Sequence, residues 1–149
     1  MPVSECCNVD VVCCAADTAV ADVAGLMRKH HVGDVIVTEE QGGKRVAVGI
    51  VTDRDIVIET IALQVDVGSF TAGDLMSVPL ATVPEQAGIV ETLRMMRSHK
   101  VRRMPVVSSN GALFGIVTSD DLINLLAMEL SMMTGAIVDQ PLREARLRT

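Results

Sequence analysis

The sequence contains two similar copies of one eight-residue stretch. Residues 49–56 read Gly-Ile-Val-Thr-Asp-Arg-Asp-Ile, and residues 115–122 read Gly-Ile-Val-Thr-Ser-Asp-Asp-Leu, 66 positions further on. Each copy begins with β-branched residues that favour a strand and continues with Thr-x-x-Asp, which can open a helix. There the threonine hydroxyl accepts a bond from a backbone amide and the aspartate accepts one from the threonine amide, forming a capping box. We therefore predict strand-to-helix junctions at Thr52 and Thr118.

The repetition continues upstream, where the spacing becomes 69 residues. Five residues of the first copy align with five of the second: Met27, Arg28, His30, Val32 and Val37 with Met96, Arg97, His99, Val101 and Val106. The change in spacing predicts a longer hairpin turn over residues 39–44 than over residues 108–111. Two copies of a unit this long indicate paired subdomains rather than a solenoid. We expect repeat 1 over residues 1–66, repeat 2 over residues 67–133, and a C-terminal tail over residues 134–149.

Hydrophobic periodicity and turn residues predict the elements of each repeat. Helices are expected over residues 17–31, 53–63, 74–76 and 119–133, and another from Pro84 through the stripe Ile89, Val90, Leu93 and Met96. Strands are expected over residues 35–38, 46–51, 104–107 and 113–117, and a polar connector over residues 64–73. Beyond Gly135 the chain contains proline and several arginines, which predicts a frayed tail.

This pattern resembles the cystathionine β-synthase (CBS) domain family, as the tandem pair called a Bateman module. The resemblance covers about residues 5–130. Within the family, the chain resembles small stand-alone two-repeat CBS proteins. It is carried by the two Gly-h-x-Thr-x-x-Asp junctions and by residues 96–107, Met-Arg-Ser-His-Lys-Val-Arg-Arg-Met-Pro-Val-Val. It implies an α/β (α+β) fold of two pseudo-symmetric CBS subdomains, each a short β-sheet packed on helices.

Composition narrows the range of partners. Apolar residues make up 49% of the chain, which indicates a globular protein, and the formal net charge of -6 disfavours nucleic-acid binding. The chain has no Trp or Tyr, and only Phe70 and Phe114 are aromatic, so a bound base must lie between aliphatic side chains. We read no secretory signal, and the apolar segment 122–138 is short for a bilayer, so we expect a cytoplasmic protein without a membrane partner.

The four cysteines form two adjacent pairs. In the repeat alignment Cys6 and Cys7 correspond to Leu75 and Met76, while residues 13 and 14 correspond to residues 82 and 83. Free cysteine behaves as a small buried hydrophobe, so we expect packing positions and assign no metal ligands. A metal or redox role for the paired thiols is the alternative.

A group of basic residues lies in an otherwise acidic chain, and it consists of Arg94, Arg97, Lys100, Arg102 and Arg103. Cations at a helix end complement the helix dipole, which accounts for Arg97 and Lys100. The family resemblance implies a nucleotide cleft between the repeats, with one role for each matching residue. Arg102 and Arg103 would contact phosphate, Asp55 and Asp121 would hold ribose, Thr52 and Thr118 would bind phosphate or cap, and Arg54 would add charge.

The first repeat departs from this pattern. Gly33 and Asp34 replace the two arginines, and Ile36 replaces the proline. Because a carboxylate at this position would repel a polyphosphate, the two clefts should differ in affinity, with the tighter site at the arginines. The sequence leaves open whether Asp55 or Asp121 shares that cleft.

The chain carries no G-x-S-x-G, P-loop, H-E-x-x-H or G-x-G-x-x-G motif, so we expect no catalytic residues and no enzyme. Our leading hypothesis is a regulatory module that senses AMP, ATP or S-adenosylmethionine, requires no cofactor, and acts on an unidentified protein. We also expect a homodimer formed through helices 53–63 and 119–133. The alternative is a structural or stress-response CBS protein that binds no nucleotide and holds metal through its cysteines.

Overall fold

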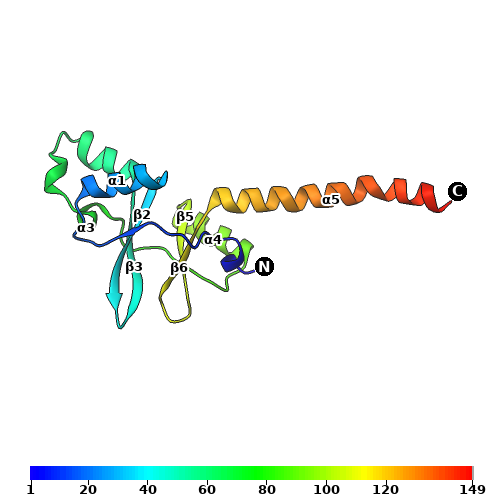
Figure 1. The fold of residues 1–149 in the computed structure, drawn as a ribbon, viewed down its shortest axis with the longest axis horizontal. Helices are drawn as coiled ribbons and strands as arrows, with labels where there is room; N and C mark the ends of the chain where they lie inside the picture. The colour runs from blue at the N-terminus through cyan, green and yellow to red at the C-terminus, as the bar shows by residue number, and fades with distance from the viewer. Residues whose placement is uncertain (149) are drawn as a thin grey trace.

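A computed structural model describes residues 1–148 as two similar halves lying side by side, with one long helix projecting from them (Figure 1). Each half contains a three-stranded sheet, in the order β1-β2-β3 or β4-β5-β6. The strands are β1 (Cys13–Cys14), β2 (Asp34–Gln41), β3 (Lys44–Thr52), β4 (Val83–Pro84), β5 (Arg103–Val107) and β6 (Leu113–Thr118). In both sheets the first pairing is parallel and the second antiparallel. The predicted pair of pseudo-symmetric α/β subdomains is confirmed.

Five α-helices accompany the sheets in the described chain: α1 (Val20–His30), α2 (Asp53–Ile56), α3 (Ala72–Leu75), α4 (Ile89–His99) and α5 (Ser119–Leu147). Short 3₁₀ turns occupy Val3–Glu5 and Val67–Ser69. Two helix starts were predicted too early. Helix α1 begins after Ala19, whose backbone is extended, and Pro84 pairs with Val107 in β4 before α4 begins at Ile89.

The predicted long turn over residues 39–44 is wrong. Strands β2 and β3 continue until Gln41 pairs with Lys44, which leaves a turn of only Gly42 and Gly43. Both glycines have positive φ angles, 58° and 78°, as a tight hairpin turn requires. The three extra residues therefore lengthen the strands of the first hairpin rather than its turn.

The predicted helix over residues 53–63 is α-helical only in its first turn. After α2 the chain continues as a π-helical turn, Val57–Ile61. The buried Thr60 hydroxyl donates a hydrogen bond to the Ile56 carbonyl within this turn. Such side-chain bonding to the preceding turn competes with the regular α-helical ladder, which explains the change of helix type.

The C-terminal tail was predicted to fray, but its residues 134–147 are helical. They belong to α5, which continues through Gly135 and Pro141 to Leu147. Proline removes one backbone hydrogen bond, but strong helix formers follow it in residues 142–147. This continuation makes the helix that contains the apolar segment longer than predicted. By length and composition α5 could cross a membrane, with a mean hydropathy of 1.4 in its apolar window. A single exposed helix of this kind is weak evidence for a membrane span.

The two hydrophobic cores exchange short segments between the halves. Helix α3, which follows the connector, packs Ala72 and Leu75 into the core of α1, β2 and β3. Conversely, Val3 is buried in the core of β5, β6 and α4, and Cys6 and Cys7 pack against that core. Residues 3–7 and 72–76 are equivalent in the repeat, so the exchange is reciprocal. It ties the halves together and holds their facing junctions in place.

Candidate functional site

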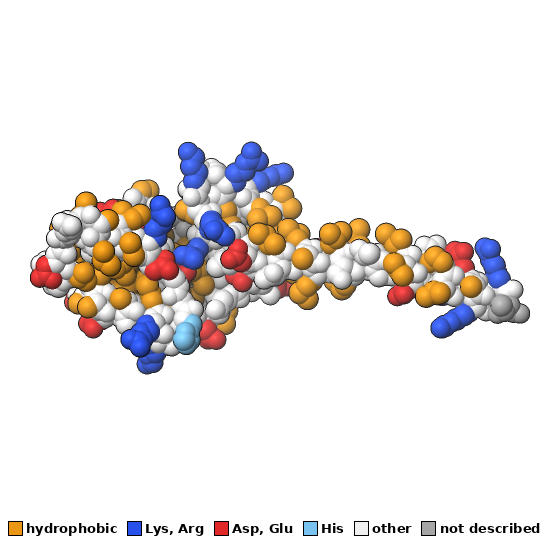
Figure 2. Space-filling model, turned by 90° about the horizontal axis from the view of Figure 1, so that it is seen from above, with side chains coloured by type: hydrophobic (Ala, Val, Ile, Leu, Met, Phe, Trp, Pro, Cys, Tyr) orange, Lys and Arg blue, Asp and Glu red, His pale blue; other side chains and the backbone are white. Residues whose placement is uncertain are grey.

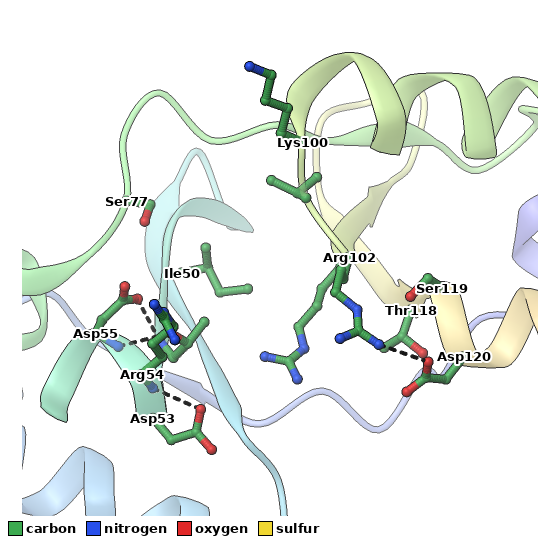
Figure 3. A pocket seen from close by; sticks show the side chains of 13 residues that line it. Ile50, Asp53, Arg54, Asp55, Ser77, Lys100, Arg102, Thr118, Ser119 and Asp120 are labelled. Carbon is green, nitrogen blue, oxygen red and sulfur yellow. Dashed lines mark hydrogen bonds and ion pairs between the residues drawn. The ribbon is translucent and has the colours of Figure 1, made fainter. Parts of the chain in front are cut away.

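A cleft of about 560 Å³ lies between the two strand-to-helix junctions. Figure 3 shows residues of the first junction on one side and residues of the second on the other, with open space between them. The lining residues are Ile50, Thr52, Asp53, Arg54, Asp55, Ser77, Lys100, Val101, Arg102, Arg103, Thr118, Ser119 and Asp120. The cleft is therefore built from both repeats, at the stretch that the sequence duplicates.

Both predicted capping boxes are present and position these walls. The Thr52 hydroxyl accepts a bond from the Asp55 amide at 3.1 Å, and the Thr52 amide donates to Asp55 Oδ2 at 2.8 Å. At α5 the corresponding bonds are 3.2 Å from the Asp121 amide to the Thr118 hydroxyl and 3.0 Å from the Thr118 amide to Asp121 Oδ2. Because both boxes fix the start of a helix, the side chains beside them are held in defined directions.

The two arginines of the predicted phosphate site differ in environment. Arg102 donates a hydrogen bond to Asp120 Oδ1 at 3.3 Å, and both side chains are largely exposed. An exposed ion pair contributes only about 0–1 kcal/mol, so Arg102 can turn toward a ligand at little cost. Figure 3 shows this pair on the wall formed by the second repeat.

Arg103 is held by a carboxylate from the other repeat. Its Nε lies 3.0 Å from Asp34 Oδ2, and the Asp34 side chain is only 17% exposed. Burial raises the pKa of Asp34 above its ordinary value, Arg103 lowers it, and neighbouring Asp53 raises it further. The carboxylate that we expected to repel polyphosphate therefore lies against one of the two arginines.

The structure brings six of the seven predicted nucleotide-binding residues into the cleft wall, namely Thr52, Arg54, Asp55, Arg102, Arg103 and Thr118. The seventh, Asp121, is not among the lining residues, and its carboxylate binds the amide and the hydroxyl of Thr118. Asp55 is thus the aspartate that shares the cleft with the arginines. The sequence could not decide this, because the answer depends on how the repeats face each other.

Several lining residues were missed by sequence reasoning. Lys100 was attributed to a solvated helix end, but it caps α4 in a left-handed conformation with a φ angle of 56° and lines the cleft. Asp53 and Asp120 lie inside the duplicated Thr-x-x-Asp motifs. Their position in these motifs could have identified them as cleft residues from the sequence. Ile50 and Val101 supply the aliphatic surface that a chain without Trp or Tyr needs for an apolar ligand group.

Three of the cysteines, Cys6, Cys7 and Cys14, pack against the two cores, whereas Cys13 lines a smaller pocket away from the cleft. All four are free and half-buried, and burial is the main cause that raises the pKa of each thiol. Within residues 1–148, no three His, Cys, Asp or Glu side chains are grouped closely enough to hold a metal ion.

Comparison with known proteins identifies the family to which this fold belongs. The CBS domain matches residues 3–60 and 72–128. An uncharacterized protein of Methanopyrus kandleri is 33% identical over 123 residues, and the match spans 83% of this chain and 61% of that protein. Hypoxic response protein 1 of Mycobacterium tuberculosis is 36% identical over 115 residues, which span 77% of this chain and 78% of that protein.

Two solved structures share the arrangement of elements. Hypoxic response protein I with two coordinated zinc ions has 33% identity and a TM-score of 0.71, covering 83% of this chain and 98% of that one. The CBS domain pair of protein MJ0100, in complex with 5′-methylthioadenosine and S-adenosyl-L-methionine, has 22% identity and a TM-score of 0.75, covering 87% of this chain and 98% of that one. The second likeness concerns the fold alone. With both halves matched, the chain belongs to the CBS domain family, as a tandem pair of CBS domains.

Proposed function

We propose that this chain is a regulatory, non-catalytic module that binds an adenine nucleotide or S-adenosylmethionine in the cleft between its two CBS domains. The observation that carries this proposal is the convergence of Asp55, Arg102 and Arg103 on one cleft, together with two aliphatic residues. Each group suits one part of an adenosyl ligand. A similar CBS pair in complex with 5′-methylthioadenosine and S-adenosyl-L-methionine supports the ligand class.

The chemistry of the wall supports this assignment part by part. Ile50 and Val101 offer apolar surface to a purine ring, since Phe70 and Phe114 pack against the two cores instead. The Asp55 carboxylate can accept hydrogen bonds from ribose hydroxyls. Arg54, Lys100 and Arg102 can make charge-assisted bonds to a phosphate or carboxylate group.

Thermal unfolding with added AMP, ATP or S-adenosylmethionine tests the proposal. Ligand at a hundred times its dissociation constant should stabilise the protein by about 2.7 kcal/mol, or roughly 5–10 °C for a chain of this size. The shift should shrink as salt rises, because ionic contacts are screened. Arg102→Ala combined with Arg103→Ala should remove most of it. A full shift in that double variant would place phosphate recognition elsewhere.

The two capping aspartates provide a matched pair of variants. Asp55→Ala and Asp121→Ala each remove one capping box and should lower the melting temperature similarly, by the loss of about 1 kcal/mol. Only Asp55→Ala should also remove the ligand-induced shift, because Asp55 lines the cleft and Asp121 does not. Equal loss of the shift in both variants would contradict the ribose role of Asp55.

A second candidate function is a structural or stress-response role with bound metal. It is favoured by the similarity to hypoxic response protein I, whose structure contains two coordinated zinc ions. Elemental analysis of the purified protein separates the two candidates. Stoichiometric zinc without bound adenine would favour the second, whereas adenine absorbance would be conspicuous in a chain without Trp or Tyr.

We also propose that the protein is a cytoplasmic homodimer and that ligand binding is transmitted to an unidentified protein through its assembly or shape. The supporting observation is the exposed apolar surface of α5 and of the π-helical turn, where Val57, Ile58 and Ile61 are exposed. Figure 2 shows apolar side chains along most of α5. A second copy would cover this surface, and light scattering at micromolar concentration measures whether it does.

A further inference from the structure

Around the cleft, carboxylates equal cationic side chains in number once Asp34, which lies behind the wall against Arg103, is counted. The cations are Arg54, Lys100, Arg102 and Arg103, and the carboxylates are Asp53, Asp55 and Asp120 in the wall with Asp34 against Arg103. The formal charges therefore cancel within the site. A highly charged anion gains little from the overall field of such a cleft, so individual contacts decide which ligand charge is accepted.

Asp34 and Arg103 occupy matching positions in the two repeats. Asp34 begins β2 and pairs with Thr52, just as Arg103 begins β5 and pairs with Thr118. Across the interface between the halves these two residues contact each other at 3.0 Å. The duplicated position thus holds opposite charges, and the pair lies where the pseudo-symmetric halves meet.

A second carboxylate approaches the same arginine. A Cβ atom at Gly33 would lie 3.2 Å from Asp53 Oδ2 and 3.6 Å from Arg103 Nη2, so these two side chains border the same space. Arg103 consequently has Asp34 on its Nε, while Asp53 borders the space beside its Nη2 end and forms no ion pair with it in the described chain. A phosphate that reaches Arg103 must approach both carboxylates, and this cost grows with the negative charge of the ligand.

We propose that Asp34 is a specificity-determining residue that neutralises Arg103 and thereby makes the cleft select adenosyl ligands with little net negative charge over triphosphates. Such ligands include a nucleoside monophosphate and a zwitterionic adenosyl compound. This inference rests on the proposed function, because it concerns the ligands of the same cleft. It assigns to Asp34, which contacts the wall residue Arg103, a role that none of the wall residues shares.

Calorimetric titration of AMP and ATP into the wild type and two variants tests the proposal. Asp34→Asn should raise the affinity for ATP about tenfold, equivalent to about 1.4 kcal/mol, and raise that for AMP less. Asp17→Asn is the matched control, because Asp17 is exposed, lies outside the cleft wall and changes the total charge equally. It should leave the ratio of the two affinities unchanged. Asp34→Ser repeats the measurement with a smaller uncharged side chain.

The role of Arg103 is tested by adding Arg103→Gln. Asp34→Asn should give no gain in that background, since the carboxylate acts through the arginine. If wild type binds AMP but neither Asp34 variant alters the ratio of ATP to AMP affinity, the inference is overturned. If wild type binds no adenine compound, the proposed function fails instead. Inorganic tripolyphosphate compared with inorganic phosphate then tests the charge selection alone, and an unchanged ratio in the Asp34 variants overturns it.

Discussion

At the scale of single residues, Asp34 combines low exposure with an ion pair. Its side chain is 17% exposed and contacts Arg103, but burial and Asp53 together outweigh that attraction and raise the Asp34 pKa. The folded protein therefore binds a proton at Asp34 more tightly than the unfolded chain does. A carboxylate in this position serves the charge balance of the cleft at some cost in stability.

This predicts a specific dependence of stability on pH. The stabilising contribution of Asp34 should be fully present below its ordinary pKa of 3.8 and should be lost as pH rises through its higher folded pKa. Asp34→Asn does not titrate, so the wild type should lose stability relative to this variant as pH rises from about 3.5 to 7. Urea unfolding of both proteins across this range measures the difference. A difference that stays constant with pH would contradict the assignment.

Cys7 shows how the repeat alignment applies at single positions. Cys7 Sγ would lie 2.8 Å from a Cβ atom at Gly115, and the equivalent Met76 side chain covers Gly49 in the same way. Cys6 packs against one core, and its equivalent Leu75 is buried in the other. The placement of Cys6 and Cys7 agrees with their expected packing role. Elemental analysis for zinc tests whether the thiols bind metal.

At the scale of elements, a short segment from the opposite half pairs with the outer strand of each sheet, β3 or β6, beside its glycine. Asn8 forms a bridge with Ile116, and Ser77 forms one with Ile50. A Cβ atom at Gly115 would lie 2.8 Å from the Asn8 carbonyl oxygen, and one at Gly49 would lie 2.8 Å from Met76 Cβ. The repeated glycine is therefore required by a close approach and not by a turn.

We predict that Gly115→Ala destabilises the protein by about 1–3 kcal/mol, because the backbone carbonyl of the paired segment must move. Gly25→Ala is the control, since Gly25 lies in α1 and a Cβ atom there has no neighbour within 4 Å. That change should stabilise by about 0.5–1 kcal/mol. Urea unfolding measures both. A Gly115→Ala protein as stable as the wild type would show that the bridge at Asn8 is dispensable.

At the scale of the whole molecule, α5 extends well beyond the two halves (Figure 1). Leu122 is its one buried residue within the described chain. Leu126, Leu130, Met133 and Ile137 recur at intervals of four, three and four residues and are all exposed. This spacing places them along one side of the helix, as in helices that pair through an apolar seam.

We predict that Met133→Glu weakens the proposed homodimer by at least about tenfold, because a carboxylate would be buried in the seam. Met128→Glu is the matched control, since Met128 is equally exposed, with 65% against 64%, but points away from the seam by helical geometry. Neither change should alter the fold of the two halves, where α5 contributes little beyond Leu122. Analytical ultracentrifugation measures the dissociation constants. A monomeric wild type, or equal weakening by both variants, would reject this seam.

The sequence alone determined the pairing of two subdomains, the junctions at Thr52 and Thr118, and six of the thirteen residues that line the cleft. Capping boxes and β-branched strand segments depend on neighbours within a few positions, so a local sequence pattern indicates each of them, once in each repeat. The tertiary structure decided that Asp55 rather than Asp121 faces the cleft, that Lys100 joins the wall, and that Asp34 reaches Arg103. Those contacts depend on how two equivalent halves face each other across segments exchanged between their cores, and no local pattern encodes that geometry.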